Sequence, residues 1–277
     1  MISDAMALGA RSLKKWIRNP FAVIVAVIQS IFWLALFGNS FNPANAFSSA
    51  AGGGSLGLLQ QAFGGAANYI TFLAPGVISI IALTGMSFMG VDLVLDRING
   101  YLNFVSTCPI PRSSIYFGGV LQNIAKAMVQ IPITFLLALV VPNGLRLAQG
   151  FGILNLLGVF ASIALLAAVF STLFTGIAIS VKNTDSFFGL VNFLTFPIMF
   201  TSTALFPISF FPSWLKPIAQ ANPISMASEA ARLLVVNGTL SATQLSAFAG
   251  DLIGLFVFLV FFAALGTFMA RNALKAR

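Results

Sequence analysis

Six long apolar stretches constrain this chain more than any other feature of its sequence. Each has roughly the 20 residues that an α-helix needs to cross about 30 Å of hydrocarbon. They run from Phe21 to Phe41, Tyr69 to Val91, Ser114 to Val141, Phe151 to Ser180, Phe187 to Phe206 and Asp251 to Ala270. The sequence therefore predicts an all-α integral membrane protein with six transmembrane helices, in which residues 1–277 form a single transmembrane domain.

The composition supports lipid as the solvent of these stretches. Hydrophobic residues make up 58% of the 277 residues and charged residues only 7%, whereas soluble domains carry roughly 25% charged residues. No soluble fold of this size could bury so much apolar surface. The net charge of +8 is interpreted as basic loops beside anionic lipid, and not as a nucleic-acid surface.

The basic residues predict the orientation of the spans. Ten of the 14 Lys and Arg residues fall on one face, three on the other, and Lys126 lies inside the third span. The ten are Arg11, Lys14, Lys15, Arg18, Arg97, Arg112, Lys182, Arg271, Lys275 and Arg277, and the three are Arg146, Lys216 and Arg232. By the positive-inside rule we expect a multi-pass protein of the cell (cytoplasmic or inner) membrane with both termini cytoplasmic.

Two cytoplasmic segments have amphipathic patterns. Residues 6–18 place apolar side chains near one helical face and basic ones mostly opposite, which predicts a helix in the membrane interface that serves as a topogenic anchor or moves with a partner. Between the second and third spans, four apolar residues recur at spacings of three and four before Pro109 and Pro111 end the pattern: Leu95, Ile98, Leu102 and Val105. A connection that only turns the chain would be shorter, so docking of a cytoplasmic partner is favoured over a passive loop.

A polar stripe crosses the third span. Gln122, Lys126 and Gln130 are spaced by four residues and therefore share one helical face. Two interpretations are open: the wall of a translocation path, or interhelical hydrogen bonds with Lys126 extending toward the cytoplasmic end. The fifth span has a weaker set in Asn192, Thr195 and Ser202.

The residues that are missing exclude several classes of chemistry. There is no His and one Cys, Cys108, which rules out a disulfide framework and disfavours a His or Cys metal site. All six carboxylates are predicted to lie at span ends or in loops, which leaves no proton relay: Asp4, Asp92, Asp96, Asp185, Glu229 and Asp251. No GxxxxGK[ST] phosphate-binding loop occurs, so a pump built on this chain needs another polypeptide for its energy.

The external segment before the last span is interrupted by four prolines. Pro207, Pro212, Pro217 and Pro223 prevent one long helix, and Asn222-Pro223 is typical of a new helix start. Glu229 and Arg232 then follow as an i,i+3 pair. The Gly/Ala/Ser-rich residues 42–68 receive no functional interpretation.

The order of these segments resembles the ABC-2 type permeases, the membrane subunits of ABC exporters. The likeness covers nearly the whole chain and rests on "RNPF", "DRINGYLNFVSTCPIPRSS" and "FPISFFPSWLKPIAQANPISMASEAAR". It implies an N-terminal elbow helix over Met6 to Arg18, a cytoplasmic coupling helix that docks on an ATPase, and external re-entrant helices. The coupling residues would be Asp96, Arg97, Ile98, Tyr101, Leu102 and Val105, and the re-entrant segment would contain Pro207, Pro212, Trp214, Pro223, Glu229 and Arg232.

The resemblance also implies a function. Two permease copies, identical or different, would pair above separate ABC ATPase subunits that hold ATP and Mg, with no cofactor and no catalytic residue in this chain. An amphipathic drug-like, lipid or glycan cargo would be exported along a path lined from the first, second and fifth spans, with Gln122, Lys126, Gln130, Asn192 and Thr195 as candidate lining residues. A stand-alone channel or facilitator is the alternative. An integral-membrane enzyme or assembly factor is disfavoured because the chain has no clustered catalytic groups.

Overall fold

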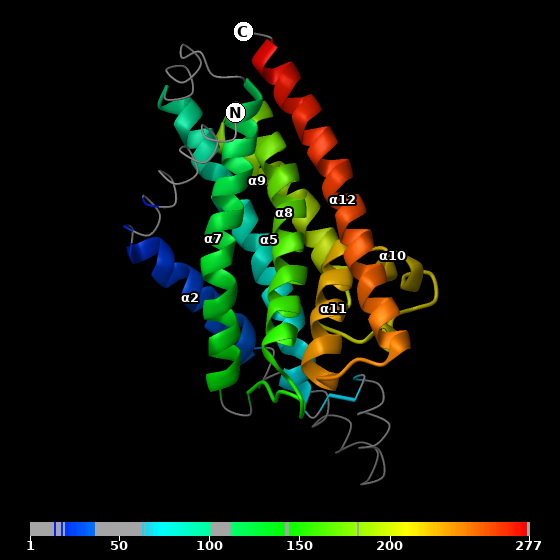
Figure 1. Cartoon of the computed structure of the whole chain (residues 1–277). Helices are drawn as coiled ribbons and strands as arrows, with labels where there is room; N and C mark the ends of the chain where they lie inside the picture. Colours follow the sequence, from blue (N-terminus) through cyan, green and yellow to red (C-terminus); the bar gives the residue numbers. More distant parts are fainter. Residues whose placement is uncertain are drawn as a thin grey trace.

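The computed structural model describes residues 14, 18, 20–36, 63, 65–66, 68–100, 112–141, 144–181 and 183–275 (Figure 1). Within these ranges the regular elements are helices and there is no strand. They are α2 (Pro20–Ala35), α5 (Tyr69–Ile98), α7 (Arg112–Val140), α8 (Ile153–Ser180), α9 (Thr184–Phe200), the 3₁₀ helix η2 (Ile208–Phe210), α10 (Lys216–Gln220), α11 (Pro223–Asn237) and α12 (Ala242–Lys275). The all-α prediction is confirmed for this part of the chain.

Four of the described helices are long and apolar enough to cross a membrane: α5, α7, α8 and α12. The 30 residues of α5 extend about 45 Å at 1.5 Å per residue, against about 30 Å of hydrocarbon. Helix α9 is also apolar but has only 17 residues, and α2 is described over 16. The number of six spans stays a prediction.

Helix α8 is the centre of the bundle. It packs against α5, α7, α11 and α12, and every residue from Ser171 to Ile179 is buried. A helix that is apolar all round is typical of such a position. Two glycines let α8 and α12 approach closely, because a Cβ on Gly176 would lie 2.8 Å from the Cα of Gly266.

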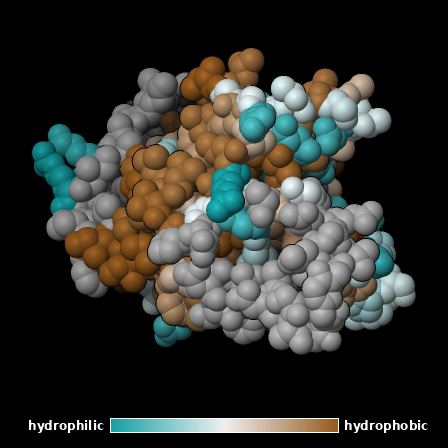
Figure 2. Space-filling view, turned by 90° about the horizontal axis from the view of Figure 1, so that it is seen from below, coloured by the Kyte–Doolittle hydropathy of each residue, from teal (hydrophilic) through white to brown (hydrophobic). Residues whose placement is uncertain are grey.

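The long helices alternate in direction. At the upper end of Figure 1, α5, α8 and α12 end while α7 and α9 begin; at the lower end α5, α8 and α12 begin while α7 and α11 end. The upper end therefore contains Arg97, Arg112, Arg271 and Lys275. The positive-inside rule predicted these four residues on the same face. Figure 2 looks onto the lower end, where apolar surface covers much of the described part and polar surface forms smaller areas.

Several helices differ in extent from the predicted spans. Helix α5 continues past Val91 to Ile98, because neither proline nor glycine interrupts it before Asn99 and Gly100, whose φ of 76° ends the helix. The last helix begins at Ala242 and not at Asp251, because Ser241 and Gln244 form a reciprocal capping box with bonds of 3.0 and 3.3 Å. Helix α9 ends at Phe200, six residues before the predicted end.

Candidate functional site

An ion pair joins α7 to α5 inside the bundle. Lys126 Nζ lies 2.6 Å from Asp92 Oδ2; the Lys126 side chain is fully buried, whereas that of Asp92 is 33% exposed. Lys126 is about 21 Å along α7 from Arg112, at 1.5 Å per residue. A buried charge is tolerated when it is paired and hydrogen-bonded.

This pair bears on the second interpretation of the polar stripe. Lys126 makes an interhelical contact, because its ammonium reaches Asp92, which lies six residues before the C-terminal end of α5. Glu229 lies on α11, the helix predicted to start at Asn222-Pro223, and Asp251 lies within α12. Lys126 and Asp92 were each visible in the sequence as charged residues in or beside apolar runs, but no sequence pattern showed that they pair.

Four other polar side chains of α7 are also buried. Asn123 Nδ2 donates to Thr175 Oγ1 of α8 at 3.3 Å, and Thr134 Oγ1 shares a 2.9 Å hydrogen bond with Ser30 of α2. Gln130 and Gln122 are both 6% exposed. Within the described residues, Gln122 Nε2 and Asn123 Oδ1 have no hydrogen-bond partner. The predicted stripe therefore lies between helices of one chain, and its role in lining a path stays a prediction.

The polar residues predicted on the fifth span separate on α9. Thr195 is buried, with its Oγ1 3.5 Å from Ser87 Oγ of α5, whereas Asn192 is exposed. Its exposed neighbours on the same helix are apolar: Leu190, Phe193, Phe196 and Phe200. Helix α9 thus has one face packed on the bundle and an aromatic face that the described residues leave uncovered.

The upper end of α5 contains the described part of the predicted coupling segment. Arg97 Nη1 donates to Ile179 O at 2.7 Å and to Val181 O at 2.6 Å, the carbonyls at the end of α8. Such carbonyls have no partner within their own helix, and a cation there also interacts favourably with the helix dipole. Asp96 is half-buried and Ile98 is 55% exposed. Tyr101, Leu102, Val105 and most of the predicted elbow lie outside the described residues.

The proline-rich segment folds back between α9 and α12. Pro207 precedes η2, Pro217 is in the first turn of α10, and Pro223 is the first residue of α11. Pro212 and Trp214 are exposed. Asn222 caps α11, because its side chain accepts from Ile224 N at 2.9 Å. The predicted start of a new helix at Asn222-Pro223 is confirmed.

Helix α11 is held in the bundle by Arg232. Its guanidinium donates to Phe72 O at 3.0 Å and Thr203 O at 3.3 Å, and it pairs with Glu229 Oε1 at 2.7 Å. It also lies 3.8 Å from the centre of the Phe72 ring. Thr203 Oγ1 donates to the same Glu229 oxygen at 2.9 Å. The predicted Glu229–Arg232 pair therefore forms, and Arg232 additionally joins α11 to α5 and to the chain after α9.

The chain after α9 lies directly on α5. A Cβ on Gly76 would be 1.9 Å from Ala204 O, so only glycine allows this approach. Tyr69 donates its hydroxyl to Leu205 O at 3.3 Å. Gly76, Phe72 and Thr203 were not predicted from the sequence. For Gly76, a glycine within an apolar span was the available signal.

Comparison with known proteins agrees with this architecture. A family model described as ABC-2 type transporter matches residues 4–236. A putative transport permease, ycf38, of Porphyra purpurea is 29% identical over the whole of this chain and 90% of its own length. A probable doxorubicin resistance ABC transporter permease, DrrC, of Mycobacterium tuberculosis is 25% identical over 82% of this chain and 75% of its own. The daunorubicin resistance permease DrrB1 of Streptomyces coeruleorubidus is 25% identical, covering 81% and 72%.

Proposed function

Because the chain belongs to the ABC-2 type transporter family, we propose that it is the membrane subunit of an ATP-driven exporter. The cargo class is an amphipathic drug-like, lipid or glycan molecule. Two relatives carry the names of doxorubicin and daunorubicin resistance permeases, which favours the drug-like class. The energy comes from a separate ATPase that holds ATP and Mg.

The end of α5 is the proposed contact with that ATPase. Its apolar side chains Leu95 and Ile98 are exposed, while the intervening Arg97 bonds to the end of α8. The exposure of Leu95 and Ile98 together with the Arg97 bonds is the observation that supports the proposal. The end of α5 is fixed to α8 and still has apolar surface available for a partner. Tyr101, Leu102 and Val105 would continue the contact.

A second permease copy is proposed to cover the aromatic face of α9. Phe193, Phe196 and Phe200 are exposed there, together with Phe88 of α5. Exposed apolar side chains of this size at an uncovered helix face suit a protein interface in the membrane as well as lipid, and the family likeness favours the former. The export path would run between the copies, beside Asn192, with the re-entrant segment from Pro207 to Arg232 on its external side.

Co-purification with the ATPase encoded beside this gene tests the docking. We expect Ile98→Asp to abolish association, because a charge would replace an apolar contact. Ile153→Asp is the matched control, since Ile153 is an exposed apolar residue at the opposite end of the bundle. Retained association of Ile98→Asp would contradict the docking assignment.

Reconstitution tests the transport function. Vesicles that contain the chain and the ATPase should accumulate doxorubicin only with ATP and Mg. Vesicles with the chain alone should show no uphill movement. Accumulation by the chain alone would contradict the proposal and favour a self-contained transporter.

A further inference from the structure

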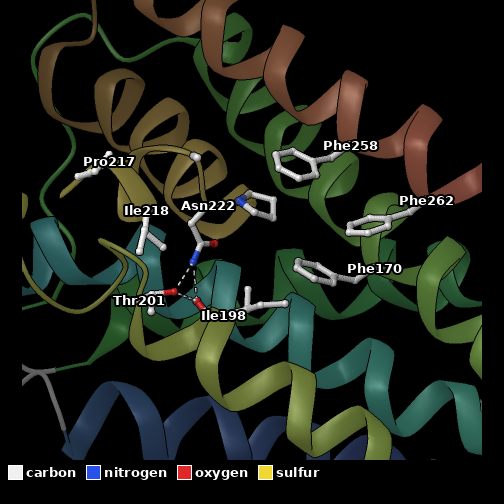
Figure 3. Close-up of a pocket in the computed structure, with 10 residues that line it drawn as sticks. Phe170, Ile198, Thr201, Pro217, Ile218, Asn222, Phe258 and Phe262 are labelled. Atoms are coloured by element: carbon white, nitrogen blue, oxygen red, sulfur yellow. Dashed lines mark hydrogen bonds between the residues drawn. The ribbon is translucent and has the colours of Figure 1, made fainter. Parts of the chain in front are cut away.

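An apolar groove lies on the outside of the bundle, where α8, α9, α10, α11 and α12 meet. Its volume is about 530 Å³, within the range of about 300–1,000 Å³ typical of small-molecule sites. Figure 3 shows Phe170, Phe258 and Phe262 on one side of the groove and Ile218 and Thr201 on the other. Ile198, Pro217, Ala221, Asn222 and Pro223 complete the lining.

The few polar groups in this groove are already bonded to the protein. Asn222 Nδ2 donates to Ile198 O at 2.6 Å and to Thr201 Oγ1 at 3.1 Å, as drawn in Figure 3. Thr201 Oγ1 in turn donates to Pro197 O at 2.8 Å, and Asn222 Oδ1 accepts from Ile224 N. A ligand that depends on hydrogen bonds would find its partners taken, whereas a hydrocarbon chain loses nothing by binding here.

The groove lies beside the middle of the longest apolar helix. Phe258 is 16 residues after the start of α12 and 17 before its end. The exposed residues of α12 next to it are apolar: Phe256, Val257, Val260 and Phe261. In a bilayer this face meets lipid tails, so hydrocarbon is the medium at the mouth of the groove.

A cation directly precedes the groove lining in the chain. Lys216 directly precedes the lining residue Pro217, is exposed, and takes no part in an ion pair among the residues that the structure describes. Lysine near apolar membrane surface directs its ammonium toward lipid headgroups. Trp214, two residues earlier, is also exposed. A hydrocarbon groove with a neighbouring cation fits an amphipathic anion.

We propose that this groove binds an acyl chain of an anionic membrane phospholipid whose phosphate pairs with Lys216. The lipid would fill the space between α10, α11 and α12 as a bound component of the protein. This inference goes beyond the transport function and needs only that the chain lies in a bilayer.

The test uses the full-length chain purified from phosphatidylglycerol-containing membranes, with bound lipid measured by native mass spectrometry. Ala221→Leu places three additional carbon atoms in the groove. Ala161→Leu is the matched control, because Ala161 is an exposed alanine of α8 outside the groove. We expect at least a threefold loss of bound phosphatidylglycerol in Ala221→Leu and no loss in Ala161→Leu.

Lys216→Gln tests the headgroup contact without altering the groove. A chain whose only tryptophan is Trp214, made by Trp16→Phe and Trp33→Phe, reports lipid proximity by quenching from acyl-brominated lipid. Brominated phosphatidylglycerol should quench at a several-fold lower mole fraction than brominated phosphatidylcholine, and Lys216→Gln should remove that difference.

Three results would overturn the proposal. Unchanged bound lipid in a correctly folded Ala221→Leu would show that the groove holds no acyl chain. Equal quenching by both lipids in the parent chain would remove the anionic headgroup. Loss of transport or of pairing in Ala221→Leu, with lipid binding unchanged, would assign the groove to cargo or to a second copy.

Discussion

Lys126 of α7 and Asp92 of α5 form an ion pair of 2.6 Å across 34 residues of sequence, with the lysine side chain fully buried. The partial exposure of Asp92 makes the two partners unequal. Removing the lysine leaves a carboxylate that the rest of the chain buries only in part, whereas removing the carboxylate leaves an ammonium that the chain buries completely.

Lys126→Met should therefore destabilise the chain less than Asp92→Leu. Breaking a buried pair typically costs about 3–5 kcal/mol, and we expect the lower end for Lys126→Met and the upper end for Asp92→Leu. The double variant should recover part of the loss, because both charges are then absent. Thermal unfolding of the three purified variants measures this order. Equal losses in all three would contradict the pairing.

A transport measurement tests the other interpretation of Lys126. Altered transport by a folded Lys126→Met would support its role in the path, and unchanged transport would not.

Replacing Arg232 should loosen α11. Arg232→Lys keeps the charge but cannot reach Phe72 O, Thr203 O and Glu229 together. We expect a loss of about 2–3 kcal/mol for Arg232→Lys and more for Arg232→Gln. Hydrogen exchange of residues 201–210 should accelerate in both. The exposed Arg146 supplies the control, and acceleration in Arg146→Gln as well would point to a general loss of structure.

Gly76→Ala and Gly189→Ala should have opposite effects. A Cβ at position 76 collides with Ala204 O, so the chain after α9 must move, at a cost of about 1–3 kcal/mol or more. Position 189 is helical with nothing within 4 Å of an added Cβ, and alanine there should gain about 0.5–1 kcal/mol. Thermal unfolding of the two variants checks the signs, and a stable Gly76→Ala would contradict the close approach.

Cysteine cross-linking tests the pairing of two copies. With the single native cysteine removed by Cys108→Ser, Phe193→Cys on α9 should form a disulfide-linked dimer in native membranes. Phe261→Cys, which is exposed on α12, should stay monomeric. A disulfide-linked dimer of Phe261→Cys, with none for Phe193→Cys, would place the interface on α12 and not on α9.

The helical class, the approximate place of the long helices and the helix start at Asn222-Pro223 were predictable, because apolar length and proline position act locally. The pairing of Lys126 with Asp92 was not predictable, since it depends on the register between α5 and α7 in the folded bundle. Helix α12 starts nine residues before the predicted span, because the capping box at Ser241 and Gln244 begins the helix ahead of the apolar run. The contacts of Arg232 with Phe72 and Thr203 join residues 160 and 29 positions apart, which no local pattern encodes.

The hydrogen bonds from Arg97 to Ile179 and Val181 have a mechanical consequence. Any displacement applied at the tip of α5 is shared at once with α8, and α8 touches α11 and α12 along its length. A movement of the end of α5 would therefore be passed through α8 to α11 and α12, near the opposite end of the bundle. This transmission does not require α5 itself to bend.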